Sequence, residues 1–205
     1  MSNELTIGAT AAGLVFKDGV VLAADKRVSY GYTVLSRSGR KVFQIGDNLG
    51  MASVGLVGDM QTLARAMTAE VKIYVLENKR QMSVRGAAKL LANILYGSKL
   101  MPYYTEVLIG GLDETGPHVY TMDAIGSVLE DSYAALGNGA PVATGILDSQ
   151  YQPDMSKAQA EELVLKAVRS AIARDITSGD GVDLLIITAS GSELKEYPAS
   201  REQKV

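Results

Sequence analysis

The spacing of apolar residues switches between strand-like and helix-like along the chain. Residues 11–27 hold two apolar, β-branched runs on either side of Lys17-Asp18-Gly19, and Asp-Gly between such runs is a strong hairpin signal. A second hairpin is expected from 32–35 and 41–45, and 49–57 is typical of a buried strand. The first quarter of the chain is therefore predicted to form sheet.

Three helices are predicted beyond this sheet. At Asp59, a good N-cap residue, the apolar period changes to that of a helix, and Ser83 caps a second helix. Ser156 and Gln159 have the spacing of a capping box, so a third helix is expected over 156–175.

The remaining apolar segments predict further strands at 106–112, 118–123, 127–135 and 183–188, whereas the charged tail after Gly191 is expected to be loose. The order is strands, two helices, strands, one helix and a last strand. This order suits an α+β domain in which helices cover the outer faces of antiparallel sheets.

Composition excludes several classes of function. The 205 residues have a net charge of -3 and no run of Lys or Arg, so nucleic acid is not an expected partner. With no cysteine and only His118, no thiolate or histidine-rich metal site is expected, and no cofactor is predicted. No apolar stretch approaches the roughly 20 residues that span a bilayer, and no signal peptide begins the chain, so a cytoplasmic protein without membrane contact is expected.

Residues 8–27, GATAAGLVFKDGVVLAADKR, resemble the opening of archaeal proteasome β subunits, where a Gly-Thr processing site leads into the first hairpin. The resemblance continues in the family's order and spacing through 39–43, 55–59, 101–103, 110–111 and 174–181. It implies the four-layer αββα sandwich of N-terminal nucleophile hydrolases, an α+β fold. Residues 1–8 would then be a propeptide-like extension and 9–205 a single β-type domain.

The resemblance also implies a set of partners. Family members form seven-membered β rings stacked inside α rings, and they cleave unfolded proteins threaded into the chamber. The expected partners are therefore α-ring subunits, other β subunits that include an active paralogue, unfolded substrates, and a regulatory ATPase that acts through the α ring.

The family's chemistry assigns roles to particular positions. One residue supplies both the attacking hydroxyl and, through its free α-amine, the general base, and a nearby cation favours the deprotonated forms. By resemblance, Lys41 is that cation and Asp25 is its charge partner. The scheme needs no histidine, so His118 is interpreted as a structural or surface residue. The other positions carried over are Asp175 and Ser178 beside the amine, Gly55 in the oxyanion hole, and Val28, Ser53 and Val57 in a small-to-medium apolar substrate pocket.

The position of the family's catalytic threonine is occupied by Ala9, counting without a gap from Gly13 and Asp25. Alanine has no oxygen, so it can neither attack a substrate nor cleave the Gly8–Ala9 bond. By analogy with removing a serine protease's nucleophile, the loss is on the order of a millionfold. A second departure is Asn138, where the family usually has a serine that helps to bind the amine and a water. Asparagine retains hydrogen-bonding groups there.

Two interpretations of function stay open. In one, the chain is a non-catalytic structural β subunit, and hydrolysis belongs to a partner. In the other, processing after Ala9 makes Thr10 the nucleophile of an active threonine endopeptidase. Successive residues of a strand point to opposite faces, so Thr10 is expected to face away from Lys41.

The alanine itself has two explanations, a natural non-catalytic paralogue or an active subunit mutated to trap its precursor. Ala11, Ala12 and Asn138 depart from the usual pattern together, which favours the natural paralogue. Retention of Asp25 and Lys41 fits either explanation, because a buried ion pair can persist for structural reasons.

Overall fold

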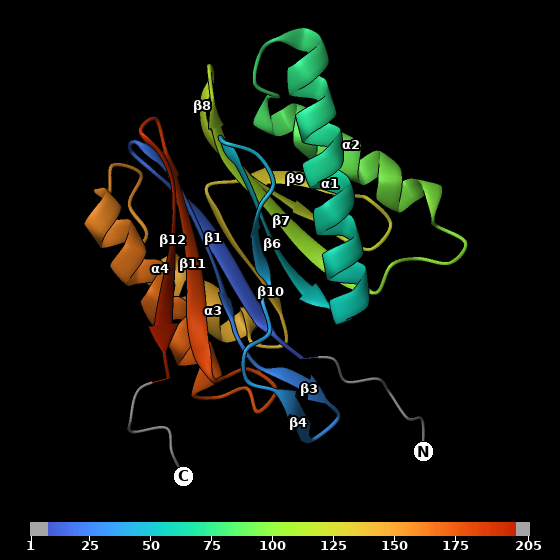
Figure 1. Cartoon of the computed structure of the whole chain (residues 1–205). Coiled ribbons are helices and arrows are strands. Elements are labelled where there is room, and N and C mark those ends of the chain that lie inside the picture. The colour runs from blue at the N-terminus through green and yellow to red at the C-terminus, as the bar shows by residue number, and fades with distance from the viewer. Residues whose placement is uncertain (1–7, 200–205) are drawn as a thin grey trace.

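The computed structural model describes residues 8–199, and the predicted extension lies outside this part except for Gly8. The described chain forms four layers, helices over sheet over sheet over helices, as Figure 1 shows. The αββα sandwich predicted from the family resemblance is therefore the observed fold. The helices are α1 (Val57–Asn78) and α2 (Val84–Gly97) on one outer face, and α3 (Ala140–Gln150) and α4 (Lys157–Ile172) on the other.

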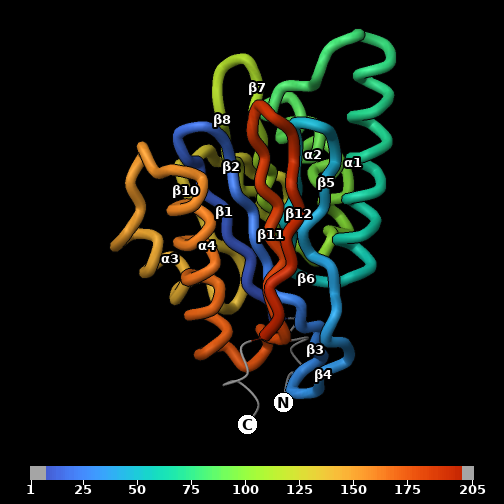
Figure 2. Tube along the Cα trace, turned by 60° about the vertical axis from the view of Figure 1, so that its left-hand side comes forward, coloured from blue at the N-terminus to red at the C-terminus, as the bar shows by residue number. Residues whose placement is uncertain are grey.

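Both large sheets are antiparallel and five-stranded, in the orders β10-β1-β2-β11-β12 and β5-β6-β7-β8-β9, with a separate β3–β4 ribbon. In Figure 2 this ribbon lies at the lower end of the molecule. The strands are β1 (Thr10–Phe16), β2 (Gly19–Asp25), β3 (Val28–Tyr30), β4 (Thr33–Ser36), β5 (Val42–Gln44), β6 (Leu49–Gly55), β7 (Thr105–Asp113), β8 (Gly116–Met122), β9 (Val128–Asp131), β10 (Tyr133–Gly137), β11 (Gly181–Thr188) and β12 (Gly191–Pro198).

The hairpin β1–β2 lies at the centre of the first sheet and is buried on both faces, which explains its nearly continuous apolar sequence. Alternate residues serve different layers. Leu14 and Val21 pack against α3 and α4, whereas Val20 and Leu22 face the second sheet.

The two sheets approach closely because glycines leave room for Leu22. A Cβ on Gly13, Gly50 or Gly110 would come within 2.6, 3.1 and 2.9 Å of a Leu22 methyl carbon. Real Cβ atoms essentially never approach under 3.0 Å, so a larger residue at Gly13 or Gly110 would force the Leu22 side chain to move.

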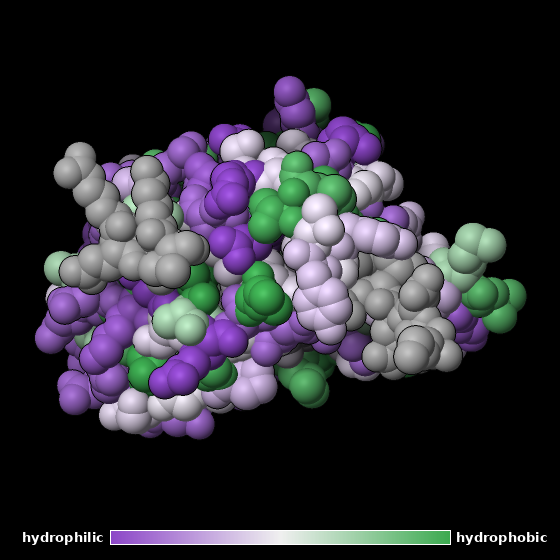
Figure 3. Space-filling model, turned by 90° about the horizontal axis from the view of Figure 1, so that it is seen from below, coloured by the Kyte–Doolittle hydropathy of each residue, from purple (hydrophilic) through white to green (hydrophobic). Residues whose placement is uncertain are grey.

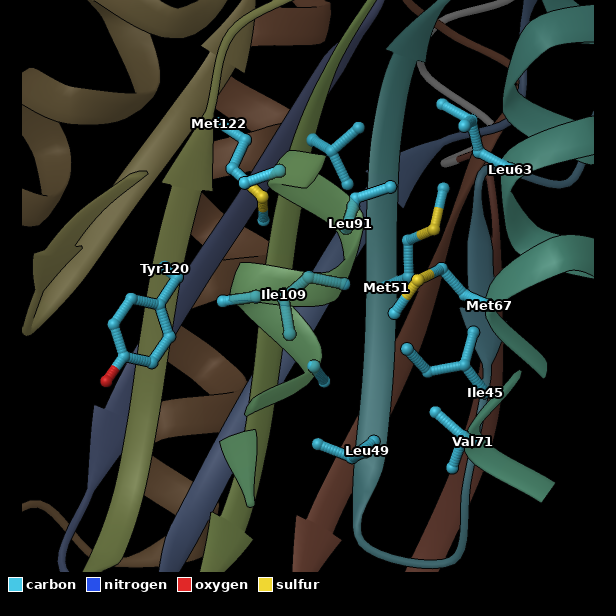
Figure 4. Packing of buried hydrophobic residues seen from close by; sticks show 14 of the residues in the cluster. Ile45, Leu49, Met51, Leu63, Met67, Val71, Leu91, Ile109, Tyr120 and Met122 are labelled. Atoms are coloured by element: carbon cyan, nitrogen blue, oxygen red, sulfur yellow. The ribbon is translucent and has the colours of Figure 1, made fainter. Parts of the chain in front are cut away.

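A second apolar layer lies between the other sheet and its helices. Met51 of β6 lies beside Met67 of α1, whereas Ile109 of β7 and Met122 of β8 lie beside Leu91 of α2, as Figure 4 shows. The flexible methionine side chains fill the irregular space between helix and sheet.

Several sequence predictions are confirmed. The first hairpin, the Ser83 cap and the full capping box at Ser156 and Gln159 are all present.

Two strand predictions are wrong. Residues 32–35 do not pair with 41–45, because β4 pairs with β3 and β5 pairs with β6. The expected strand 127–135 is two strands, β9 and β10, and the chain crosses from one sheet to the other at Ser132. A turn signal fixes where a chain reverses, but strand partners depend on contacts distant in sequence.

The start of α1, the C-terminal segment and the region of α3 also differ from the sequence prediction. Helix α1 begins at Val57 after Leu56, so Asp59 is not its N-cap, and the Asp59 carboxylate instead accepts a hydrogen bond from the Tyr104 amide. The tail after Gly191 was expected to be loose, but its residues up to Pro198 belong to the edge strand β12 along β11, and residues 200–205 lie outside the described part of the chain. Helix α3 was not predicted, since it is short, contains Gly145 and has no side-chain N-cap, although Pro141 in its first turn is compatible with a helix start.

Candidate functional site

Asp25, the last residue of β2, is fully buried and accepts hydrogen bonds through both carboxylate oxygens. Its Oδ1 receives the Lys41 ammonium at 2.7 Å and the Thr10 amide at 2.9 Å. Its Oδ2 receives the Arg27 amide at 3.0 Å and the Gly179 amide at 2.9 Å. Four donors from four segments of the chain thus hold this carboxylate in one orientation.

Lys41 lies just before β5 and is held against β6 by a hydrogen bond from the Ser53 amide to its carbonyl, at 2.9 Å. Its side chain is 3% exposed. Burial lowers the pKa of Lys41, and the Asp25 carboxylate opposes that shift. The ion pair with Asp25 therefore works against the loss of the lysine's charge on burial.

A relay of hydroxyls connects Thr10 to Asp175. The Thr10 and Ser178 hydroxyls lie 2.8 Å apart, and Ser178 donates to Asp175 Oδ2 at 2.5 Å. Because Ser178 uses its proton on Asp175, Thr10 donates to Ser178. The Thr10 side chain is fully buried and lies against Gly139 and Ala171, on the side of α3 and α4.

Ala9 precedes β1 and is 2% exposed. It belongs to the apolar cluster between the sheets, together with Val42 beside Lys41 and Val54 beside Gly55. Ala9 and Thr10 therefore occupy different faces of the strand. Immediately upstream, Gly8 lies so close to Thr177 that a Cβ there would stand 1.6 Å from the Thr177 hydroxyl oxygen, so only glycine fits this backbone.

Gly55 and Asn138 line the same cavity of about 320 Å³ between the end of β6 and the turn that follows β10. Gly55 has a φ of +127°, in the region that favours glycine, and a Cβ there would meet the Tyr104 carbonyl oxygen at 2.1 Å. Glu106 also lines this cavity, and its carboxylate accepts a hydrogen bond from the Gly137 amide at 3.0 Å.

The three residues of the expected substrate pocket are more dispersed. Val28 lies in the β3–β4 ribbon, Ser53 is buried in β6 and Val57 begins α1. Their role in substrate binding stays a prediction. His118 lies in β8 at the opposite end of the β6–β7–β8 strands from Gly55, and its ring contacts Thr115 and Glu130.

Hydrogen bonds from two arginines hold the 176–180 turn in place, and this arrangement, here the clamp, was not predicted from the sequence. Arg27 donates to Asp180 at 2.8 Å and to the Ile176 carbonyl at 2.8 Å, and Arg37 donates to the other oxygen of Asp180. This clamp fixes the segment whose Gly179 amide reaches Asp25. The family resemblance included residues 174–181 and so identified this segment, but no rule of sequence spacing connects the segment to Arg27 or Arg37.

Figure 3 views the end of the molecule that carries the β3–β4 ribbon, where hydrophobic patches lie among hydrophilic ones. Within residues 8–199, no three His, Asp or Glu side chains are grouped so as to hold a metal ion. None of the helices in this range combines the length and apolarity that crossing a membrane would require.

Comparison with known proteins identifies the family. The family model described as "Proteasome subunit" matches residues 5–187. The chain is 52% identical to proteasome subunit beta 2 of Thermofilum pendens over 196 residues, which cover 96% of each chain. It is 49% identical to proteasome subunit beta 2 of Pyrobaculum calidifontis, covering 96% of this chain and 97% of the relative. It is 50% identical to proteasome subunit beta 1 of Ignicoccus hospitalis, covering 90% and 92% respectively. The chain therefore belongs to the proteasome subunit family, as an archaeal β-type subunit of the core particle.

Proposed function

We propose that this chain is a non-catalytic β subunit, which shapes the ring and lines the chamber while a partner β subunit hydrolyses the substrate. The observation that carries the proposal is the methyl group of Ala9. It belongs to the apolar cluster that includes the neighbours of Lys41 and Gly55, where the chemistry needs a hydroxyl. Asp25, Lys41, Asp175 and Ser178 would then persist as a structural network.

The environment of Thr10 argues against its use as a nucleophile. Its side chain is fully buried, and its hydroxyl is bonded to Ser178 on the side of α3 and α4. If processing freed its α-amine, the Asp25 carboxylate beside that nitrogen would favour the charged ammonium, which cannot act as a base.

One observation favours the alternative, an active threonine endopeptidase that uses Thr10. The relay from Thr10 through Ser178 ends on the Asp175 carboxylate, so a path for the hydroxyl proton exists. A chain that begins at Thr10 in assembled particles, with hydrolysis lost in Thr10→Ala, would establish this alternative.

The resemblance further supports a place for this subunit in the cytoplasm, within a machine that degrades unfolded proteins. A regulatory ATPase would deliver these substrates through the α ring. The relatives carry the names subunit beta 1 and subunit beta 2, which fits particles that contain more than one kind of β subunit.

The test compares particles assembled from α subunits and this β chain alone. The natural chain should retain Gly8 by intact mass and hydrolyse no peptide. Ala9→Thr should cleave the bond after Gly8 and gain peptide hydrolysis, whereas Ala9→Val, which has the shape of threonine without its hydroxyl, should do neither. Hydrolysis by the natural chain that survives in Ala9→Val and is lost in Thr10→Ala would overturn the proposal.

A further inference from the structure

The turn between β10 and α3 places an asparagine between two glycines, Gly137 and Gly139. Asn138 is exposed and lines the cavity that also contains Gly55 and Glu106. Gly137 has a φ of +85°, in the left-handed region, and Gly139 is the N-cap residue of α3. The backbone on both sides of Asn138 therefore carries no side chain that restricts its rotation.

An asparagine that precedes a glycine can react with its own backbone. The nitrogen of the following residue attacks the side-chain amide carbon, a new C–N bond closes a succinimide ring, and ammonia leaves with the proton of that nitrogen. Water then opens either carbonyl of the ring and leaves aspartate or isoaspartate. Asparagine is a thermolabile residue, and a following glycine hinders the attack least because it has no Cβ.

Hydrogen bonding in the described chain leaves both reacting groups unoccupied. Within residues 8–199, neither the Asn138 side chain nor the N–H of Gly139 has a hydrogen-bond partner. The carbonyl of Gly139, by contrast, accepts bonds from the Val142 and Ala143 amides, each at 3.1 Å. The attacking nitrogen thus gives up no hydrogen bond when the side chain rotates toward it.

Packing explains why glycine follows Asn138. A Cβ on Gly139 would collide with the Thr10 side chain and would stand 2.8 Å from the Cβ of Ala171. A larger residue at 139 would therefore displace the buried Thr10 hydroxyl, which bonds to Ser178. The fold requires glycine at this place, and this requirement keeps Asn138 beside the residue type that hinders the reaction least.

The other asparagines of the described chain have different surroundings. They are Asn48, Asn78 and Asn93, and they precede leucine, lysine and isoleucine. The Asn48 amide nitrogen donates to two backbone carbonyls, and that of Asn78 donates to the Tyr74 carbonyl at 2.9 Å. Asn93 lies inside α2, where the next N–H belongs to the hydrogen bonds of the helix. These three residues are controls within the same molecule.

We propose that Asn138 is a modification site, at which the folded chain converts asparagine to aspartate or isoaspartate through a succinimide. Either product places a carboxylate in the cavity beside Gly55 and Glu106, where the chain now has a neutral amide. Isoaspartate also adds a methylene group to the main chain directly before Gly139, which lengthens the connection to α3. The inference does not depend on whether this chain hydrolyses peptides.

The test incubates the natural full-length chain, folded, at elevated temperature and mildly alkaline pH, because the attacking nitrogen must lose its proton. Peptide mapping by mass spectrometry should find the peptide that contains Asn138 about one dalton heavier, with isoaspartate detected by labelling with an isoaspartyl methyltransferase. Conversion at Asn138 should be at least roughly tenfold faster than at the three control asparagines. Asn138→Asp provides the reference for the aspartate product in ion-exchange chromatography.

Two controls separate the chemistry from the fold. Asn138→Gln keeps an amide at this exposed position but would have to close a larger ring, so it should stay unmodified, and circular dichroism checks that it is folded. The same incubation in urea measures the reaction of the unfolded chain.

Three outcomes would overturn the inference. An unmodified Asn138 in the folded chain, whether or not the chain reacts in urea, would show that the turn holds the side chain away from the Gly139 nitrogen. Equal rates at all described asparagines would show that the turn has no special reactivity. Aspartate without isoaspartate would show direct hydrolysis of the amide instead of a succinimide.

Discussion

At the scale of single residues, the geometry around Asp25 decides how much of an N-terminal nucleophile site this chain retains. Its carboxylate binds Lys41 and also fixes the backbone at Thr10 and Gly179. A buried lysine without its counterion is costly, so this pair is needed for folding whether or not the site is catalytic. Retention of Asp25 and Lys41 is therefore weak evidence for activity.

Asp25→Asn should destabilise the chain by about 3–5 kcal/mol, because it leaves the Lys41 ammonium buried without a negative partner. Urea unfolding followed by circular dichroism measures the loss. The double variant Asp25→Asn/Lys41→Met removes both charges and should recover part of it. A double variant no more stable than Asp25→Asn alone would contradict this account.

Asp180→Asn tests the clamp on the 176–180 turn through its pH dependence. Burial raises the pKa of Asp180, but hydrogen bonds from Arg27 and Arg37 outweigh it, so the net pKa lies below its ordinary value of 3.8. A depressed carboxyl pKa stabilises the fold above that value, and the stabilisation is lost as pH falls through the folded pKa. The variant should be about 1–3 kcal/mol less stable than the natural chain at pH 7.

The gap in stability between Asp180→Asn and the natural chain should narrow as the pH falls below 3.8 and through the lowered pKa of Asp180, because the protonated carboxyl group carries no charge, like the asparagine amide. Urea titrations at pH 7 and pH 2.5 compare the two. Arg37→Gln removes the more exposed of the two arginines that bond Asp180, so at pH 7 it should cost less stability than Asp180→Asn. An equal gap at both pH values would mean that charge is not what holds the turn.

At the scale of helices and strands, a sequence signal predicted an element correctly where all the residues that form the signal lie within a few positions of one another. The capping box at Ser156 was predictable because its two hydrogen bonds join positions three apart, and both are present. Helix α3 had no such signal. Strand β12 has charged residues on its exposed side. Because of them the sequence did not predict a strand there, although half-buried residues pack β12 along β11 and α4.

Ser156→Ala should lower the free energy of unfolding by about 1 kcal/mol, because the backbone donor at the start of α4 loses its partner. Thermal and urea unfolding report the change. Ser149→Ala, whose hydroxyl bonds the Ile146 carbonyl within α3, is a control outside any N-cap. A loss no larger than that of the control would argue against a capping contribution.

At the scale of the whole molecule, the distance between the two sheets depends on one large side chain among small ones. Leu22 occupies the space left by Gly13, Gly50 and Gly110, and it is fully buried. The close approach of the two sheets places the end of β2, and with it Asp25, near Lys41 beside the second sheet.

Leu22→Ala should destabilise the chain by roughly 2–5 kcal/mol, because neighbouring glycines cannot fill the cavity. Denaturant unfolding measures this. Leu194→Ala is the control, since Leu194 is 44% exposed on an edge strand and should cost far less. Equal costs at the two positions would contradict the described packing.

The sequence by itself determined the family, the first hairpin, the starts of α2 and α4 and the absence of a hydroxyl at position 9, because each depends on a short run of neighbouring residues. Tertiary structure alone decided which strands pair, where the chain crosses between sheets, and how Arg27 and Arg37 clamp Asp180. The pairing of β1 with β10 and of β2 with β11, like the clamp, joins residues more than a hundred positions apart, and packing, rather than local preference, brings such residues together.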